Sequence, residues 1–412
     1  MSTAADSIPS AESILEWFVG EEITMLALLK RLVALEAPSA DVEGIGAFVS
    51  AYRTELERWG ATATEIPGPN GPHLYAELPA SGSERGPPIA LVGHADTVWP
   101  RGELQRRPMR IDRGRLYGPG VFDMRAGLSL IVFLLRFLHE RGVRLDRRLQ
   151  VFVAADEELG SITAHEHMQL LLSREAIGLV VEPPLPDGSL KAQRKGVGLY
   201  TLRVHGREAH AGVEPERGVS AIVELMQSSL EIHSWAKAIE GLTVNLGQVR
   251  GGTATNVVPG TASVGIDVRF DRLEDGERFD RRLRELAPRH SEARFELEGG
   301  IIFPPLVPDA RARRLGELAR AAARSIGLEI DAGKTGGGSD ASFLASFGMA
   351  VLDGLGVDGG GAHALDEHIV IERLPVRGAI LTRLVLELAT GAGGGDGVDG
   401  GGASWRASPR AR

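Results

Sequence analysis

Four short segments of the sequence are almost entirely apolar: residues 89–92, 149–154, 179–181 and 350–352. Apolar runs of this length are typical of strands that are buried on both faces of a mainly parallel sheet. The longer stretch at residues 14–35 instead repeats apolar side chains with the period of a helix, as do residues 45–59 and 310–326. The alternation predicts an α/β fold, and parallel sheets of this kind bind ligands at the carboxyl ends of their strands.

The middle of the chain has a different pattern. Residues 198–205, 242–249 and 261–270 have the composition of strands, and residues 219–238 have the periodicity of one amphipathic helix. The proline-rich stretch at 302–308 suits a linker that returns to the first domain. These features predict a second, inserted domain of α+β type.

The domain organisation that we expect therefore has three parts. A catalytic domain is built from residues 1–196 and 304–390, and the inserted domain spans residues 197–303. The glycine-rich tail at 391–412 offers too little apolar surface to become ordered, so we expect it to be disordered.

Composition narrows the possible chemistry. The chain has no cysteine, which excludes thiol nucleophiles and zinc-thiolate sites, so any metal must be bound by histidine and carboxylate side chains. A formal net charge of -9 argues against a nucleic-acid partner. The acidic N-terminal region lacks the features of a secretion signal, which predicts a cytoplasmic location. The strongest apolar run, 128–138, is shorter than the roughly 20 residues of a membrane span, so we expect a buried helix and no membrane partner.

The first candidate ligands follow the apolar run at 89–92. His94 and Asp96 are two positions apart, so their side chains project the same way from an extended chain. A histidine that binds a metal commonly has its other ring nitrogen held by a carboxylate, and this pair fits that arrangement. A core histidine beside an aspartate in a turn is the alternative. Asp123, in a glycine-rich bend before an apolar helix, fits either a metal ligand or a helix cap.

Three carboxylates crowd together directly after the apolar run at 149–154. Asp156, Glu157 and Glu158 repel one another, and this arrangement is costly without a cation. A solvated acidic turn would give the same pattern, since Leu159 and Gly160 also fit a surface bend.

Two further candidates follow the remaining apolar runs. Glu182 ends the run at 179–181, and His363 lies in a glycine-rich loop after the run at 350–352. Together the motifs place two histidines and at least four carboxylates at the strand ends of one sheet. Histidine and carboxylate ligands without sulfur favour zinc, with manganese or cobalt as substitutes.

These motifs closely resemble those of the di-zinc co-catalytic exopeptidase and amidohydrolase family, which includes bacterial glutamate carboxypeptidase, aminoacylase, acetylornithine deacetylase and succinyl-diaminopimelate desuccinylase. The resemblance is carried by GHADTV, GPGVFDM, ADEELGS, VEP, GGGAH and TGGGSDASF. HAGVEPERGVSA and TNVVP are most similar to the glutamate carboxypeptidase branch. The resemblance implies a phosphorylase/hydrolase-like catalytic domain with an inserted ferredoxin-like dimerisation domain.

Carried over motif by motif, the resemblance also implies the metal ligands. It makes Asp123 the bridge between two zinc ions, with His94 and Glu182 completing one site and Glu158 and His363 completing the other.

The same resemblance assigns the remaining roles. Glu157 is the general base, and Asp96 orients His94. His210, in the AHAG motif, reaches the active site of the partner subunit in a homodimer, although the residue type also suits an ordinary surface histidine. Asn256 and Arg269 bind the carbonyl and carboxylate ends of the substrate, with a strand-face ion pair as the alternative for Arg269.

Two departures from the family pattern stand out. The usual Asp-Met-Lys-Gly-Gly reads Asp-Met-Arg-Ala-Gly from Asp123 to Gly127, which retains the positive charge. The stretch GSLKAQRKG before residue 196 lacks the pattern that holds a glutamate side chain in folate-cleaving members, so the resemblance does not carry a preference for glutamate.

The expected function is a zinc-dependent hydrolase that cuts an amide bond next to a free carboxylate, in a short peptide or an N-acyl amino acid. The planar fork of Arg269 binds two carboxylate oxygens at once, which favours a carboxypeptidase-like enzyme. An N-acyl amino acid deacylase is the alternative. A metal-binding protein without catalysis is disfavoured by the presence of Glu157.

Overall fold

The computed structural model describes residues 8–82 and 84–389, and the predicted disorder of the tail lies outside the described residues. The chain divides into two compact units. Of the described residues, the first contains those up to Gln193, together with Val307–Thr335 and residues 339–389. The second contains Arg194–Leu306 and Gly336–Gly338.

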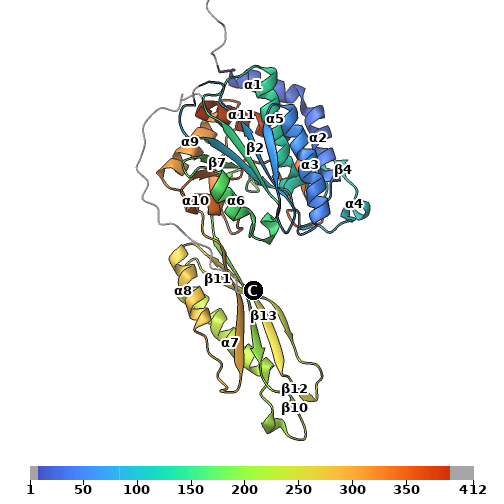
Figure 1. Cartoon of the computed structure of the whole chain (residues 1–412), viewed down its shortest axis with the longest axis vertical. Coiled ribbons are helices and arrows are strands. Elements are labelled where there is room, and N and C mark those ends of the chain that lie inside the picture. Colours follow the sequence, from blue (N-terminus) through green and yellow to red (C-terminus); the bar gives the residue numbers. More distant parts are fainter. Residues whose placement is uncertain (1–7, 83, 390–412) are drawn as a thin grey trace, which may run out of the picture. The chain divides into compact units, whose positions relative to one another are not determined.

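The first unit is built on a six-stranded sheet with the order β1-β2-β6-β3-β7-β16 (Figure 1). The four strands from β6 to β16 are parallel, which confirms the predicted mainly parallel sheet. An antiparallel pair, β1 and β2, extends it at one edge and was not predicted. The strands are β1 (Thr62–Ile66), β2 (His73–Leu78), β3 (Ile89–His94), β6 (Leu149–Ala154), β7 (Ile177–Val180) and β16 (Ala350–Leu352).

The helices of the first unit cover this sheet. Strands β3 and β6 are buried along their whole length, as the continuous apolar runs require. The apolar pattern at 14–35 is divided between two helices. The first ends at Gly20 and the second begins at Glu22, with Glu21 between them. The helices are α1 (Ala11–Gly20), α2 (Glu22–Ala34), α3 (Val42–Arg58), α4 (Glu103–Arg106), α5 (Ala126–Glu140), α6 (Ala164–Leu171), α9 (Ala310–Arg324), α10 (Asp340–Ser346) and α11 (Arg373–Ala389).

Shorter elements complete the first unit. A four-stranded sheet has the order β17-β18-β5-β4, and β15 pairs with β8. Two short helical segments lie at the sheet's edge. The segment η1 (Val121–Arg125) precedes α5, and η2 (Glu157–Leu159) follows β6. The strands are β4 (Arg110–Asp112), β5 (Arg115–Tyr117), β8 (Leu190–Arg194), β15 (Ala332–Thr335), β17 (Gly359–Gly360) and β18 (His368–Val370).

The second unit has the order of elements β9-α7-β11-β13-α8-β14, with the antiparallel sheet order β11-β13-β9-β14. This is the topology of a ferredoxin-like fold. Both helices contribute to the core, where Trp235 of α7 packs edge-on against Phe279 of α8 at 5.6 Å. The elements are β9 (Gly196–His205), α7 (Ala221–Trp235), η4 (Ala236–Ala238), β11 (Thr243–Gly251), β13 (Thr261–Phe270), α8 (Leu273–Arg284) and β14 (Arg294–Phe303).

A two-stranded ribbon extends from one end of the second unit's sheet. Its strands are β10 (Ala209–His210) and β12 (Val257–Val258), and the turn η3 (Pro215–Arg217) follows β10. Among the described residues of both units, no helix is long and apolar enough to span a lipid bilayer.

Candidate active site

The register of the parallel strands brings three of the predicted motifs to one edge of the sheet. His94, the last residue of β3, is paired with Ala154, the last residue of β6. Val180 of β7 is paired with Val92, so that Glu182 follows at the level of His94. Because neighbouring parallel strands end together, the side chains that follow them converge.

Asp123 lies between the two predicted histidines. Its Oδ1 is 3.2 Å from Nε2 of His94, and its Oδ2 is 3.4 Å from Nε2 of His363. On the first side, Oε1 of Glu182 is 3.5 Å from the same His94 nitrogen. On the second side, Oε1 of Glu158 is 3.1 Å from the His363 nitrogen. Each oxygen of Asp123 thus faces a different imidazole, and each imidazole has a second carboxylate beside it.

Asp96 supports this arrangement in two ways. Its main-chain oxygen is 3.0 Å from Nδ1 of His94, closer than its carboxylate at 3.4 Å. The carboxylate oxygens instead accept hydrogen bonds from the main-chain N–H groups of Glu157 and Glu158, at 3.0 and 3.2 Å, and from Ser39 Oγ at 2.8 Å. Buried Asp96 therefore joins the end of β3 to the turn that carries both glutamates.

The potential ligand atoms form two overlapping groups within 4.8 Å: His94 with Glu157 and Glu182, and His94 with Asp123 and Glu158. Glu157 is therefore close enough to be a ligand itself.

The carboxylates control the protonation of the two histidines. Burial disfavours a charged His94, but hydrogen bonds with Asp123, Asp96 and Glu182 outweigh it and raise the pKa of His94 well above its ordinary value. Hydrogen bonds with Asp123 and Glu158 raise the pKa of His363 to about 10. Burial would raise the pKa of Asp123, but both imidazoles lower it to well below the ordinary range. The site strongly favours positive charge between its carboxylates.

The two adjacent glutamates behave differently from Asp123. Burial, together with the charges of Glu182, Asp340 and Glu158, raises the pKa of Glu157 well above that of a free glutamate, although His94 opposes the shift. Burial and the charge of Asp123 also raise the pKa of Glu158. A carboxyl with a raised pKa accepts a proton more readily, which suits Glu157 to general base catalysis.

Gly127 allows helix α5 to start close to the ligands. A Cβ atom at this position would lie 2.0 Å from the main-chain oxygen of Val181, the residue before Glu182. Gly127 therefore permits a close contact between α5 and the end of β7. Ala126, where the family pattern has its first glycine, is fully buried.

The other three predicted residues belong to the second unit. His210 and Asn256 lie together on the ribbon, where the N–H of Ala211 donates to the oxygen of Asn256 at 2.9 Å. Arg269 lies near the end of β13 and makes a forked ion pair with Asp267, at 2.6 and 2.7 Å. The ion pair that the sequence left as an alternative is therefore present.

Sequence reasoning missed two residues at the edge of the site. Nζ of Lys191 is 4.0 Å from Oε2 of Glu182. Glu367, four positions after His363, is buried and accepts hydrogen bonds from the segment that carries Asp123. The signal for Glu367 was an acidic residue inside the GGGAHALDEH motif, whereas nothing in the pattern around Lys191 distinguishes it from a surface lysine.

Comparison with known proteins identifies the family. Residues 90–387 match the model of peptidase family M20/M25/M40. The chain belongs to this peptidase family. The match includes all ten predicted site residues, and it confirms both the resemblance and the prediction of a hydrolase that acts on amide bonds.

Individual members of the M20/M25/M40 family are similar over most of their length. The chain is 29% identical to carboxypeptidase G2 of Pseudomonas sp. (strain RS-16), over 90% of this chain and 91% of that protein. It is 27% identical to succinyl-diaminopimelate desuccinylase of Thioalkalivibrio sulfidiphilus (strain HL-EbGR7), over 74% of this chain and 85% of the relative.

Solved structures of the M20/M25/M40 family share the fold. The M20 metallo-carboxypeptidase Sso-CP2 of Sulfolobus solfataricus superposes with a TM-score of 0.70 at 16% identity, covering 88% of this chain and 98% of the other. The YXEP protein of Bacillus subtilis, described as a dinuclear metal binding peptidase, has a TM-score of 0.63 at 18% identity, covering 90% and 99%. The family is metal-dependent, so the chain is a metallopeptidase or amidohydrolase.

Proposed function

We propose that the protein is a di-zinc exopeptidase that hydrolyses an amide bond adjacent to a free carboxylate. The observation that carries the proposal is the position of Asp123, whose two oxygens face His94 and His363 separately. A single carboxylate that faces two separate sets of nitrogen and oxygen donors suits a ligand shared by two cations.

The donor set fits divalent metal ions. Nδ1 of His94 contacts the Asp96 carbonyl, which directs Nε2 toward the oxygens of Asp123 and Glu182. A nitrogen lone pair that faces carboxylates is repulsive unless a cation or a proton lies between them. Imidazole and carboxylate ligands without sulfur are typical of zinc, and manganese or cobalt can bind to the same set. Asp123, His94 and Glu182 would hold one ion, and Asp123, Glu158 and His363 the other.

The chain's own residues perform the remaining chemistry. Two divalent cations held in this way supply Lewis acidity, which polarises a carbonyl and makes water nucleophilic at neutral pH. Glu157 takes the proton from the attacking water and delivers it to the leaving amine. His210 donates a hydrogen bond to the developing oxyanion, and Asn256 binds the carbonyl end of the substrate.

The substrate class follows from Arg269 and from the relatives. A guanidinium binds a carboxylate through two parallel hydrogen bonds, which suits a peptide or N-acyl amino acid with a free carboxylate. Similarity to carboxypeptidase G2 supports a carboxypeptidase, and similarity to desuccinylases supports deacylation of an N-acyl amino acid as the second candidate.

A substrate panel tests the proposal. Dipeptides and N-acyl amino acids, each paired with its C-terminal amide, would be assayed with the zinc-, cobalt- and manganese-loaded enzyme and after chelation. Chelator-sensitive turnover of acids but not amides is expected. Turnover that survives removal of all metal, or metal-loaded protein that hydrolyses no member of the panel, would contradict the proposal.

Arg269→Ala is expected to raise KM for carboxylate substrates by about 10–100-fold, because a charge-assisted hydrogen bond contributes roughly 1.5–3 kcal/mol. KM for the matching amides should change little. Arg203→Ala on β9 is a suitable control, because it removes an exposed ion pair with Glu298 of β14. Equal losses on acids and amides would instead mean that Arg269 serves only its ion pair with Asp267.

The second unit supports a homodimer with shared active sites. The ribbon that carries His210 and Asn256 leaves the sheet beside Thr261, at one end of β13, whereas Arg269 lies near the other end. The eight steps along the strand from Thr261 to Arg269 span about 27 Å at roughly 3.4 Å per residue. A small substrate cannot reach both ends within one subunit, so His210 and Arg269 act at one site only if two subunits contribute.

An exposed apolar stripe provides a surface for the second subunit. Val223, Met226 and Leu230 follow one another along one face of α7 and are 52%, 62% and 74% exposed. Apolar side chains at this spacing are typical of a helix face that packs against a partner.

Complementation tests the sharing of sites. His210→Ala and Arg269→Ala should each lose most of their kcat/KM on carboxylate substrates, and a heterodimer of the two variants should regain one intact active site. The measurement is the specific activity of heterodimers purified with two different affinity tags. Heterodimers of verified composition that are no more active than either parent would show that each subunit uses its own His210.

A further inference from the structure

Glu367 is a buried carboxylate outside the proposed set of metal ligands. Its exposed fraction is 1%. It lies in the loop of His363, where the N–H of Ala364 donates to Gly361 and the N–H of Glu367 donates to Ala364, at 2.8 and 3.1 Å. A buried charge is costly unless its oxygens are satisfied by donors, so its partners indicate why it is there.

Four N–H groups converge on this carboxylate. Three of them are main-chain groups of the segment that carries Asp123. The distances to Glu367 are 2.7 Å from Trp99 Nε1 and 2.8 Å from Gly120 N, both to Oε2, and 3.0 Å from Phe122 N and 3.1 Å from Asp123 N, both to Oε1. In addition, the N–H of Gly118 donates to the main-chain oxygen of Glu367 at 3.2 Å.

Only a carboxylate matches these donors. Each oxygen accepts two N–H groups, and a glutamine would replace one acceptor oxygen by an amide NH2 group, which can only donate hydrogen bonds. Two buried N–H groups would then lose their partner, which is unfavourable.

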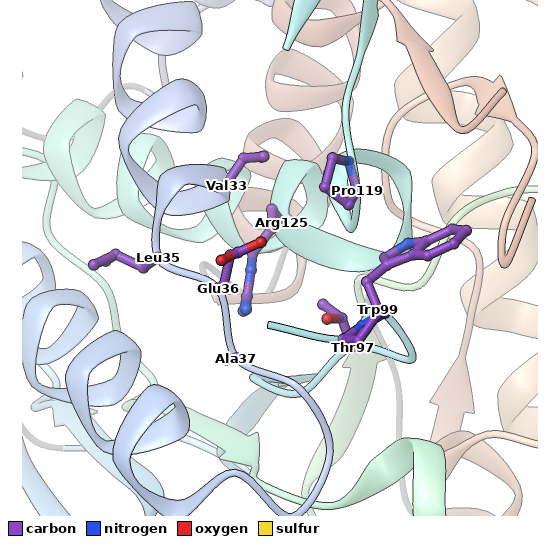
Figure 2. Close-up of a pocket in the computed structure, with 9 residues that line it drawn as sticks. Val33, Leu35, Glu36, Ala37, Thr97, Trp99, Pro119 and Arg125 are labelled. Carbon is purple, nitrogen blue, oxygen red and sulfur yellow. The ribbon is translucent and has the colours of Figure 1, made fainter. Parts of the chain in front are cut away.

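Burial raises the pKa of Glu367 to about 7, and a buried cation lies near its carboxylate. Arg125 is 2% exposed and lies over the ring of Phe48 at 3.5 Å, and its Nη1 has no hydrogen-bond partner among the described residues. Its positive charge interacts with both Asp96 and Glu367. Figure 2 shows Arg125 together with Thr97, Trp99 and Pro119 in the lining of a small pocket with room for about one water molecule. Trp99, a hydrogen-bond donor to Glu367, therefore lies beside this pocket.

We propose that Glu367 is a positioning residue that holds the Asp123 segment against the His363 loop and so sets the distance between the shared carboxylate and its second imidazole. The inference rests on the proposed two-metal site. Asp123 and His363 are 240 positions apart in the sequence, and both would ligate the same ion. Glu367 accepts hydrogen bonds from the main chain of the Asp123 segment and belongs to the His363 loop.

Glu367→Gln tests the inference, with Glu224→Gln as the matched control. Glu224 is 5% exposed and likewise accepts two main-chain N–H groups, from Arg289 and His290, but it lies in the second unit. Zinc affinity would be measured by competition with a chromophoric chelator, and kcat, KM, the visible spectrum of the cobalt-loaded protein and Tm would be recorded for both variants.

The expected result is a loss of about 10–100-fold in zinc affinity or kcat for Glu367→Gln, the size usual for residues that orient metal ligands. KM should stay near the wild-type value, and the cobalt spectrum should change. Glu224→Gln should lower Tm but leave zinc affinity, kcat and the spectrum unchanged. The inference would be overturned if Glu367→Gln had the zinc affinity, kcat and cobalt spectrum of the wild type, or if both variants lost these properties equally.

Trp99→Phe covers the case in which Glu367→Gln does not fold. This change removes one of the four donors and keeps an aromatic ring in place. A smaller fall in kcat with an altered cobalt spectrum is expected, and an unchanged spectrum and kcat would overturn the inference. Measurements on the wild-type protein distinguish failure of the proposed function from failure of this inference. If the wild type binds no metal, the proposed function fails. If the wild type binds two ions and the variants behave like it, the inference about Glu367 fails.

Discussion

Glu157→Gln is expected to lower kcat by about 10²–10⁴-fold while both metal ions stay bound, because the amide cannot accept the proton of the attacking water. Glutamine has nearly the same shape as glutamate, and the N–H of residue 157 can still donate to Asp96. The change therefore removes the base without disturbing the turn. The measurement pairs steady-state kinetics on the preferred substrate with metal content by mass spectrometry.

The metal content decides between two roles for Glu157. Its carboxylate lies within 4.8 Å of the ligand atoms of His94 and Glu182, so it could bind a metal ion directly. A variant that loses one ion together with its activity would show a ligand instead of a base, and one that retains near-normal kcat would show neither. Glu166→Gln on the exposed side of α6 serves as the control and should behave like the wild type.

Asp123→Ala is expected to abolish measurable turnover and to weaken the binding of both ions at once. Metal ions supply several kcal/mol of transition-state stabilisation, and each 1.36 kcal/mol is a factor of ten in rate, so a loss of about 10³-fold or more follows. The shared position of Asp123 makes this substitution different from the others. In the proposed assignment, Glu182→Ala removes a ligand of the ion beside His94, and Glu158→Ala removes a ligand of the ion beside His363.

Metal stoichiometry after gel filtration is the readout that separates these variants. Wild type should retain two ions, Glu182→Ala and Glu158→Ala one each, and Asp123→Ala the fewest. Tm should fall in the same order, because a ligand present at about 1,000 times its Kd stabilises the fold by roughly 4 kcal/mol. Asp123 would be misassigned as the shared ligand if Asp123→Ala kept two tightly bound ions. It would also be misassigned if Asp123→Ala lost only one ion and bound the other as tightly as Glu182→Ala does.

The sequence alone predicted the four parallel strands of the central sheet and the polar residues that follow them. The runs at 149–154 and 350–352 coincide with β6 and β16, because a strand buried on both faces must be apolar at every position. His94, Glu157, Glu158 and Glu182 could be named for the same reason. Polar side chains that directly follow buried parallel strands meet at one edge of the sheet, whatever the details of packing.

Other features depended on contacts that no local pattern encodes. Strand β1 at the edge of the sheet and its neighbour β2 are only partly buried, so their apolar pattern is weak. The hydrogen bonds of Glu367 join residues that are 244 to 268 positions apart. The ion pair between Arg269 and Asp267 uses residues that are two positions apart, but whether the two side chains meet depends on their geometry in the folded strand.

The division has a physical reason. Burial and backbone periodicity are properties of each segment, and they are written in the order of apolar and polar residues along the chain. Hydrogen bonds and ion pairs depend on distances of a few ångströms between segments that only the packed fold brings together. The sequence could therefore say which side chains reach the edge of the sheet, whereas the tertiary structure decided that Asp123 faces two imidazoles at once and that Glu367 holds its main chain.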